Sequence, residues 1–584
     1  MKRINRFKQF AEVGHYMAIV LCVTLFLASC DKKKNEEPEP EPNVAAVSIA
    51  AIPGVTKPVA GAAPITTIIE TEQYTGVVTW TPAVSGTFAA ETDYTATITL
   101  TAKSGYTFNG VETNFFIVDG ATTVSNAANS GNVTAKFSVN VEANGITWEI
   151  TKDGTLIISG TGAMPDYSGI HHPRPPKPQP WLSIGNSITA VVINDGVTSI
   201  GGSAFSGCIS LMEVTIPNSV TSIGNHAFSY CSSLSEIIIP NSVESIGSLA
   251  FGSCSSLSEI TIPNSVESIE VGAFEGCSSL TSVTIPSSVA SIGSPVFYGC
   301  SGLTSIYVEE SNPVYTSEDG ILFNKSKTEL ITYPAGKLDL NYTIPNTVTS
   351  IGSCAFSSCI GLSKVTIPNS MTTIGYSAFY ACSSLTEIFI PNTIETIEDY
   401  AFHGCGNLTE VTIPNSVISM GDYTFYGCTG LTSVTIGSSV TSIGHSAFLG
   451  CAGLTSLSSI TIPASVTTIG PSAFSYSGLT SVIIPSSVTT IKHFAFAWCY
   501  DLTSVTIPSS VTSFENFVFC DCHGLTEVVN ESVMPQTISE FAFANLNPYG
   551  LCSSACTLRV PKESIDAYRV AEGWKDFGNI VAIE

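Results

Sequence analysis

Apolar residues recur along most of the chain in a pattern that repeats every 23 residues. One complete unit, residues 243–263, has Val-x-x-Ile-Gly, then Ala-Phe, Cys and Leu, and ends in Ile-x-Ile-Pro, with Ser, Thr, Glu and Asn between these positions. The Cys of the unit marks the step in two series: Cys208, Cys231, Cys254, Cys277 and Cys300, and then Cys359, Cys382, Cys405, Cys428 and Cys451. A fixed period of this length is typical of a solenoid, in which stacked units bury a continuous core.

Each unit predicts two short strands and two turns. Residues 211–216 have the Leu-x-x-Val-x-Ile spacing of a leucine-rich-repeat strand, and Pro217 ends that strand because proline has no N–H for a ladder. Residues 220–224 form a second extended segment that a Gly closes, and the following Ala-Phe places a large ring inside. We therefore expect a mainly β fold: a leucine-rich-repeat solenoid of about fourteen coils of 23 residues, spanning residues 196–557.

The repeat fails in one long stretch, residues 309–347. The step from Cys300 to Cys359 is 59 residues, and the excess contains two apolar runs, 320–323 and 330–334, around a polar turn. This spacing predicts a hairpin-like variant coil. Near Ser477 the Cys is absent and the local spacing slips, which could bend the stack.

Other segments flank the solenoid. Residues 44–141 contain short alternating stretches separated by Gly, Pro and Asn, which predict an Ig-like β-sandwich module of six or seven strands, with Trp80 in its core. Residues 145–195 carry a hairpin turn at 152–154 and then a Pro-rich loop, so we expect an N-terminal cap there. Residues 558–584 should form a C-terminal cap with a short helix that begins near Ser564.

The first thirty residues have the layout of a secretory signal peptide, since a basic start precedes an apolar run too short to span a membrane. The sequence Leu-Ala-Ser-Cys at 27–30 resembles a bacterial lipoprotein signal. That resemblance implies cleavage after residue 29 and a lipid on Cys30; plain signal cleavage is the alternative. Residues 30–43 then form a polar tether, similar to those of surface-exposed lipoproteins in the Bacteroides group, which implies an outer-membrane location facing outward.

The composition of the chain limits which ligands, disulfides and metal sites are expected. Charged residues make up only 12% of the chain and the formal net charge is -25, so binding to nucleic-acid phosphates is not expected. The chain has 18 cysteines, and stacked coils point equivalent side chains the same way, which favours a buried ladder of free thiols over disulfides. Cys552 and Cys556 could still pair. Neither His171-His172 nor residues 520–523 predict a metal site.

The frame Ile-Pro-x-Ser-Val-x-x-Ile-Gly-x-x-Ala-Phe-x-x-Cys-x-x-Leu closely resembles the BspA-type leucine-rich repeats, also called Treponema-type, over about residues 190–560. The resemblance implies an extracellular bacterial protein. Some members act as adhesins for host matrix proteins or other bacteria, so the implied partners are extracellular proteins or glycans. The resemblance names no ligand for this chain.

Candidate binding residues lie at outward positions of the first strand. Ser and Thr occupy most of these positions, whereas Tyr307 and Phe389 are aromatic, which is common for binding anchors. They could instead be tucked under the variant hairpin. Glu213, Glu236 and Glu259 recur at one position and should stack as like charges, either for a basic partner or cation, or as a solvated acidic face.

An enzyme is not expected. The eight histidines are scattered, and neither a phosphate-binding loop nor a nucleophile elbow occurs. We therefore expect a surface protein without cofactors that binds macromolecules through its strand face. The alternatives are a structural scaffold, or a glycan-capture protein with no adhesin role; recognition of ice or a crystalline polymer by the Thr column ranks lower.

The proposed lipid anchor has a direct test. Cys30→Ala removes the thiol that would carry the lipid, so we expect the protein to leave the membrane fraction, and Cys22→Ala, in the apolar run of the signal, serves as the matched control. Fractionation with immunodetection measures the distribution. Continued membrane retention of Cys30→Ala would rule out the anchor.

Overall fold

The computed structural model describes residues 44–58, 62–89, 92–137, 145–168, 178–455, 460–539, 541–543 and 556–584. The chain divides into two compact units, one made mainly of residues 44–137 and one that contains the repeats. Cys30, the segments 1–29 and 30–43, His171, His172 and Cys552 lie outside the described residues.

The first unit is built on a four-stranded antiparallel sheet in the order β2-β3-β6-β5. Its strands are β2 (Tyr74–Thr81), β3 (Tyr94–Ala102), β5 (Thr123–Asn126) and β6 (Asn132–Phe137), and a separate parallel pair joins β1 (Ala45–Ala46) and β4 (Tyr106–Thr107). Residues 114–118 are one of the alternating stretches that predict a strand, but they form only a bridge from Ile117 to Ala51, and Asn114 has a φ of 58°. An Ig-like sandwich is therefore not confirmed.

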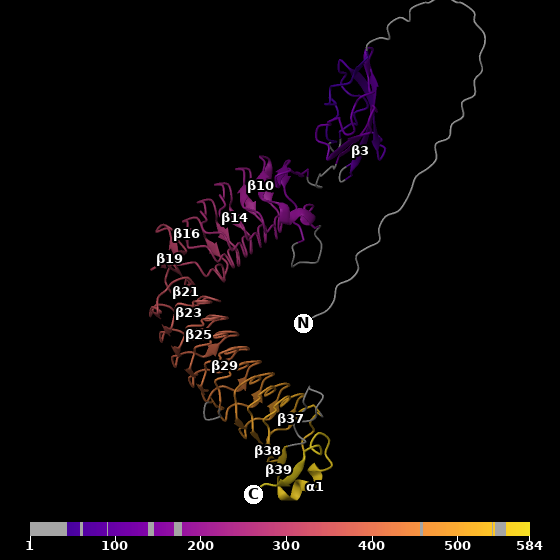
Figure 1. The fold of residues 1–584 in the computed structure, drawn as a ribbon. Coiled ribbons are helices and arrows are strands. Elements are labelled where there is room, and N and C mark those ends of the chain that lie inside the picture. The colour runs from indigo at the N-terminus through magenta and orange to yellow at the C-terminus, as the bar shows by residue number, and fades with distance from the viewer. Residues whose placement is uncertain are drawn as a thin grey trace, which may run out of the picture. The chain divides into compact units, whose positions relative to one another are not determined.

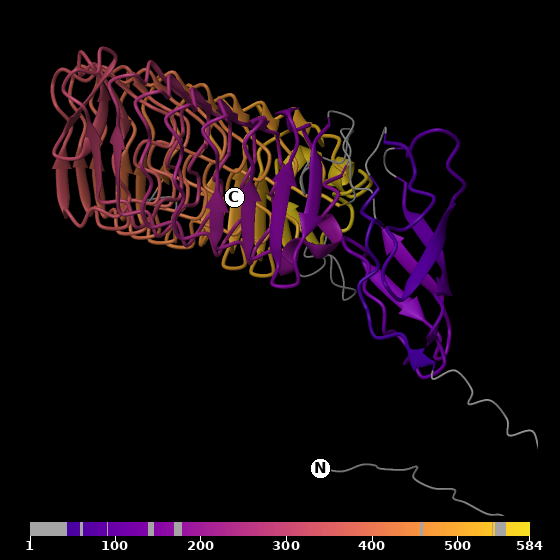
Figure 2. The same cartoon turned by 90° about the horizontal axis from the view of Figure 1, so that it is seen from above.

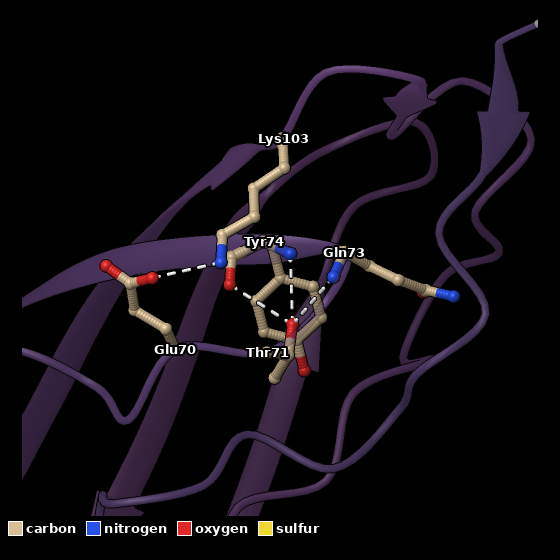
Figure 3. A network of polar contacts seen from close by, with 5 residues as sticks. All are labelled: Glu70, Thr71, Gln73, Tyr74 and Lys103. Atoms are coloured by element: carbon tan, nitrogen blue, oxygen red, sulfur yellow. Dashed lines mark hydrogen bonds and ion pairs between the residues drawn. The ribbon is translucent and has the colours of Figure 1, made fainter.

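Polar contacts fix the corner where the first unit enters β2 (Figure 3). The Thr71 hydroxyl accepts the N–H groups of Gln73 and Tyr74 at 3.2 and 2.9 Å, and it donates to the Tyr74 carbonyl. An ion pair of 2.9 Å joins Lys103 to Glu70 across the same corner. These bonds satisfy the backbone where the turn becomes a strand.

The second unit is a solenoid of about 16 turns of roughly 23 residues, two more than the sequence predicted. The difference arises at the ends. Strands β7 (Thr147–Ile150) and β8 (Thr155–Ser159) form a hairpin, and β8 pairs in parallel with β10 (Ala190–Ile193). Strand β9 (Gly162–Ala163) pairs in parallel with β11 (Val197–Ile200), so the entry segment is itself a coil. Helix η1 (Leu182–Ser187) lies between β9 and β10.

In most coils two sides are strands that pair in parallel with a neighbouring coil (Figures 1 and 2). The first-strand side comprises β12 (Glu213–Thr215), β16 (Ser282–Ile285), β18 (Ser305–Val308), β22 (Asn341–Thr343), β24 (Lys364–Thr366), β26 (Glu387–Phe389), β28 (Glu410–Thr412), β30 (Ser433–Thr435), β32 (Ile460–Thr461), β34 (Ser481–Ile483), β36 (Ser504–Ile507), β38 (Glu527–Asn530), β39 (Thr557–Val560) and β40 (Asn579–Ala582). The second-strand side comprises β13 (Ser222–Ile223), β14 (Ser245–Ile246), β15 (Ser268–Ile269), β17 (Ser291–Ile292), β23 (Ser350–Ile351), β25 (Thr373–Ile374), β27 (Thr396–Ile397), β29 (Ser419–Met420), β31 (Ser442–Ile443), β33 (Thr468–Ile469), β35 (Thr490–Ile491) and β37 (Ser513–Phe514).

The third side of each coil is a run of turns around Ala-Phe, which we call the turn side. In one coil His226 and Tyr230 have φ values of 57° and 63°, and the N–H groups of His226, Phe228 and Tyr230 donate to carbonyls of the next coil at 2.7–2.8 Å. The intervening N–H of Ala227 bonds back to Gly224 within its own coil. Because some residues adopt the left-handed conformation, every second N–H group points toward the next coil. The backbone N–H groups on the turn side therefore also find hydrogen-bond acceptors.

The variant coil consists of β19 (Tyr315–Glu318), β20 (Ile321–Asn324) and β21 (Glu329–Thr332). The strands β19, β20 and β21 pair antiparallel in that order, and β21 then pairs in parallel with β23. At the far end, η3 (Lys562–Ser564) and α1 (Ile565–Tyr568) form a short helical segment, and Tyr568 and Trp574 are fully buried there.

Stacked aromatic rings run through the interior. Neighbouring centroids lie 5.3–5.7 Å apart in the first stack: Trp181, Phe205, Phe228, Phe251, Phe274 and Phe297. They lie 5.0–5.4 Å apart in the second: Tyr333, Phe356, Phe379, Phe402, Phe425, Phe448, Phe474, Phe496, Phe519 and Phe543. The core likewise divides at the variant coil, into one cluster over 146–331 and one over 321–577.

The ladder cysteines are free and buried, and their thiols make hydrogen bonds. From Cys231 onward these thiols donate to the carbonyl of the aromatic residue in the preceding coil; Cys231 to Phe205 and Cys382 to Phe356 are examples, at 3.2 and 3.0 Å. Where Ser477 replaces Cys, its hydroxyl contacts the Cys499 thiol at 3.3 Å. The cysteine is thus a small apolar residue that also satisfies a buried carbonyl.

Burial should make these thiols unreactive, because the thiolate is the nucleophile. Burial raises the pKa of Cys208, Cys254 and Cys428 to about 12, and that of the partly exposed Cys354 to about 11. We expect iodoacetamide at pH 8 to leave these ladder thiols unlabelled in the native protein, as peptide mass spectrometry would report. Labelling of the ladder at the rate of unfolded protein would contradict this packing.

The raised pKa values of these thiols predict that the stability of the protein depends on pH. Thiols of the unfolded chain lose their protons near pH 8.5, whereas Cys208, Cys254 and Cys428 keep theirs in the folded state, so at these residues the folded state binds more protons above that pH. The free energy of unfolding should therefore fall as the pH rises from about 8.5 toward 12.

Candidate functional site

Outward side chains of the first strands form a surface that we call the strand face. Along β26 the burial alternates, with Glu387 and Phe389 exposed and Ile388 buried, as expected for a strand packed on one side. Most coils place Ser or Glu at the first outward position and Thr at the second. Four coils place a large, exposed apolar residue at the second position instead: Ile238, Tyr307, Phe389 and Ile483.

Both predicted aromatic anchors lie on this face and are exposed. Tyr307 on β18 stands beside Thr284 of β16 and is 53% exposed, and Phe389 on β26 stands beside Thr366 of β24 and is 65% exposed. The variant hairpin therefore covers neither ring. The two rings belong to different sheets, so the structure does not bring them together.

Hollows lie beside two of the predicted residues on the strand face. The larger, about 620 Å³, lies along β26 and β28 and is lined by Phe389, Glu387 and Glu410 among others. The smaller, about 410 Å³, is lined by Glu259, Thr261, Thr284 and Glu309. One predicted aromatic residue and one predicted acidic residue thus border depressions that a ligand could occupy.

The three predicted acidic side chains are exposed, but only one of them lies in a strand. Glu213 begins β12, whereas Glu236 and Glu259 precede coil segments that are joined only by a bridge between Ile238 and Thr261. Glu236 and Glu259 each lie two residues before that parallel bridge, so they are neighbours on the face. Further along, Glu387 pairs with Lys364 at 2.9 Å in an exposed ion pair, an interaction that contributes little to stability.

A second surface, on the turn side, was not predicted. We call it the tyrosine–histidine surface, and it consists of Tyr376, Tyr380, Tyr400, His403, Tyr423, Tyr426 and His445. Tyr400 stacks on Tyr423 with centroids 4.7 Å apart, and His403 lies between Tyr380 and Tyr426 at 4.6 Å from each. The Tyr400–Tyr423 stack and the Tyr380–His403–Tyr426 stack also contact each other, because the ring centroids of Tyr423 and Tyr426 lie 6.0 Å apart. The rings form one partly exposed layer over four coils.

Aspartates hold this layer in place. The Asp399 carboxylate accepts the N–H of Asp422, and the Asp422 carboxylate accepts the N–H of His445, both at 2.7 Å. Tyr400 and Tyr423 follow directly, in left-handed conformations with φ of 59° and 57°. Burial lowers the pKa of His403. Burial, neighbouring phenols and the carboxylates of Asp399 and Asp422 raise the pKa of Tyr400.

Another aromatic group lies on the turn side of later coils. Trp498 stacks on Phe494 and Tyr476 at 5.3 and 5.0 Å, and Phe494 stacks on Phe517 at 5.0 Å. Beside them a shallow hollow of about 490 Å³ is lined by His493 and Glu515. Burial opposes ionisation of Glu515, but hydrogen bonds from Lys492 and His493 prevail and lower its pKa to about 2.

The sequence held a signal for these rings. They recur one coil apart at a variable turn position adjoining Ala-Phe, where His226, His445 and His493 also stand. Tracing its column through successive coils would have shown Tyr400 above Tyr423. The left-handed conformation itself is not readable, because most of these residues are not glycine.

Catalytic or metal-binding clusters do not stand out. Within the described ranges, no group of three or more His, Cys, Asp and Glu side chains is arranged to hold a metal ion. Cys522 is a ladder residue, and its thiol donates to the Phe496 carbonyl. Among the helices of the described segments, none has the length and apolarity needed to cross a membrane.

Comparison with known proteins identifies the class. The model of the BspA type leucine rich repeat region matches residues 184–304, 336–455 and 452–550, which is more than half of the chain. The chain therefore belongs to the BspA-type leucine-rich-repeat family, as the repeat frame predicted. A search of curated proteins finds no match.

Several solved structures are similar. A leucine-rich repeat protein from Eubacterium ventriosum is 30% identical, with a TM-score of 0.49, over 64% of this chain and 91% of its own. A leucine rich cell surface protein from Faecalibacterium prausnitzii is 26% identical, with a TM-score of 0.34, over 67% and 94%. A leucine-rich repeat protein from Bacteroides ovatus is 24% identical, with a TM-score of 0.39, over 76% and 99%.

Proposed function

We propose that this protein is a lipid-anchored cell-surface protein that binds extracellular macromolecules through its strand face. The observation that carries the proposal is the exposure of large apolar residues on a sheet otherwise lined with Ser and Thr. Phe389 and Tyr307 are more than half exposed, and Ile238 and Ile483 reach 82% and 68%. Exposed aromatic and aliphatic residues on a rigid sheet supply contact area at little entropic cost.

The hollow beside Phe389 supports the same face. Its apolar ring stands next to Glu387 and Glu410, so an apolar contact and hydrogen-bond acceptors are available within one depression. Rigid strands hold these side chains, since their backbones pair on both sides. Family membership and the cell-surface relative from Faecalibacterium prausnitzii agree with a surface location for this chain.

Two alternatives remain as distinct functions: a structural scaffold, or glycan capture without adhesion. Binding rather than catalysis is the proposal, because the exposed features of the strand face are apolar side chains and rows of carboxylates rather than an acid–base pair around a nucleophile. A scaffold would bind neither matrix proteins nor glycans through this face.

The test is capture of extracellular-matrix proteins and of surface glycans by the full-length chain. The double variant Tyr307→Thr plus Phe389→Thr installs the residue that neighbouring coils carry in this column, so it preserves the sheet. We expect capture by the wild type and a loss of about tenfold or more in affinity by the variant. Thr435→Ser, in the same column on β30 and away from the hollow beside Phe389, is the matched control.

Absence of capture by the wild type would contradict a binding role. Capture that the double variant retains in full would contradict the strand face as the binding surface. Capture of glycans alone would support the glycan-capture alternative over adhesion to proteins.

A further inference from the structure

The tyrosine–histidine surface is separate from the strand face and combines two features. Its rings come from four successive coils and touch one another, so they form a rigid, partly apolar layer rather than scattered side chains. Tyr376, at one edge, is 45% exposed. Such Tyr-rich layers offer contact area with hydroxyl groups at the rim, as binding surfaces commonly do.

The charge around this layer has one sign. Between Lys364 and Lys492 the chain contains neither Lys nor Arg. The same stretch contains six carboxylates: Glu387 and Glu410 lie on the strand face, whereas Glu395, Glu398, Asp399 and Asp422 lie in the segments that flank β27 and β29. Asp399 and Asp422 directly precede Tyr400 and Tyr423, and both carboxylates act on the Tyr400 phenol. The layer therefore lies in a negative potential that no basic side chain of these coils offsets.

We propose that the tyrosine–histidine surface binds a basic, Arg- and Lys-rich segment of a partner protein. The aliphatic stems of Arg and Lys would lie on the ring layer, since these side chains bury their methylenes on apolar surface while their charged heads stay solvated. The phenol oxygens and the outer carboxylate oxygens accept hydrogen bonds from guanidinium and ammonium groups. This interaction is independent of the strand-face function.

The layer is a costly feature that the fold does not need. Tyr400 and Tyr423 hold left-handed conformations that disfavour a bulky side chain, yet Ser377 and Ser446 occupy the equivalent positions of the flanking coils. Their rings lie outside the buried core, where the Phe stack already fills each coil. Strain of this kind at partly exposed aromatic residues points to a role outside folding.

Equivalent positions in other coils of the chain indicate which substitutions the fold accepts. Tyr400→Ser plus Tyr423→Ser gives these coils the residue of their neighbours. Asp399→Asn plus Asp422→Asn removes two charges but keeps the carbonyl oxygen that accepts the next N–H, as Asn225 does for Ser248 at 2.8 Å. Tyr307→Thr plus Phe389→Thr alters only the strand face and serves as the control.

The experiment is fluorescence anisotropy with the full-length chain and a fluorescein-labelled Gly/Ser peptide that carries Arg at alternate positions. The same peptide with Gln in place of Arg is the neutral probe, and a neutral oligosaccharide is the second. Circular dichroism and thermal unfolding confirm that each variant folds. We expect the Arg peptide to bind and the Gln peptide not to bind, with weaker binding at high salt.

Both the Tyr and the Asp double variants should weaken binding by about tenfold or more, while the strand-face control binds as the wild type does. Failure of the Arg peptide to bind would overturn the proposal. Equal binding by all variants would also overturn it, because the net charge of the whole chain would then explain the attraction. Binding of the oligosaccharide alone, lost in Tyr400→Ser plus Tyr423→Ser, would reassign the surface to a glycan.

Discussion

Each coil must bond to the next on three sides at once, and this requirement governs the rest of the solenoid. Parallel strands satisfy the backbone on two sides, and alternate N–H groups of left-handed turns satisfy it on the third. Coils that pair this closely bring equivalent side chains into contact, so the interior must accept the same residue in every coil. A flat ring stacks on its copy, as Phe228 does on Phe251 at 5.5 Å. The Cys thiol fills the small remaining space and donates a hydrogen bond to the backbone carbonyl of the aromatic residue one coil earlier.

That constraint separates structural from functional residues. Inward positions are fixed by stacking, whereas outward positions on the strand face and the turn side face solvent and can differ between coils. The coils do differ there: Thr gives way to Phe389 and Tyr307 on one side, and Ser gives way to Tyr400 and Tyr423 on another. Both proposed binding surfaces therefore use the same scaffold without altering its core.

Periodicity made the solenoid predictable, since Val, Ile, Phe, Cys and Leu must recur wherever coils stack. The first unit was predicted in part: its β2, β3 and β6 strands follow from alternation, whereas alternation at residues 114–118 indicates a half-buried segment but does not determine whether it finds a strand partner. The strand-face candidates followed from alternation along Leu-x-x-Val-x-Ile, and the structure places Tyr307, Phe389, Glu213, Glu236 and Glu259 on the exposed side. The tyrosine–histidine surface was missed because its residues come together only through left-handed turns, which Ser, Tyr and Phe do not signal.

The central claim is that the buried stack makes the fold while the exposed aromatics leave it unchanged. Comparing the free energy of urea unfolding between Phe251→Ala and the pair of single variants Tyr307→Thr and Phe389→Thr tests it most directly. Phe251 is fully buried in the ring stack, so its loss should lower the free energy of unfolding by about 3–5 kcal/mol. Each Thr variant should stay within about 0.5 kcal/mol of the wild type. A large loss of stability in the Thr variants, or none in Phe251→Ala, would contradict the account.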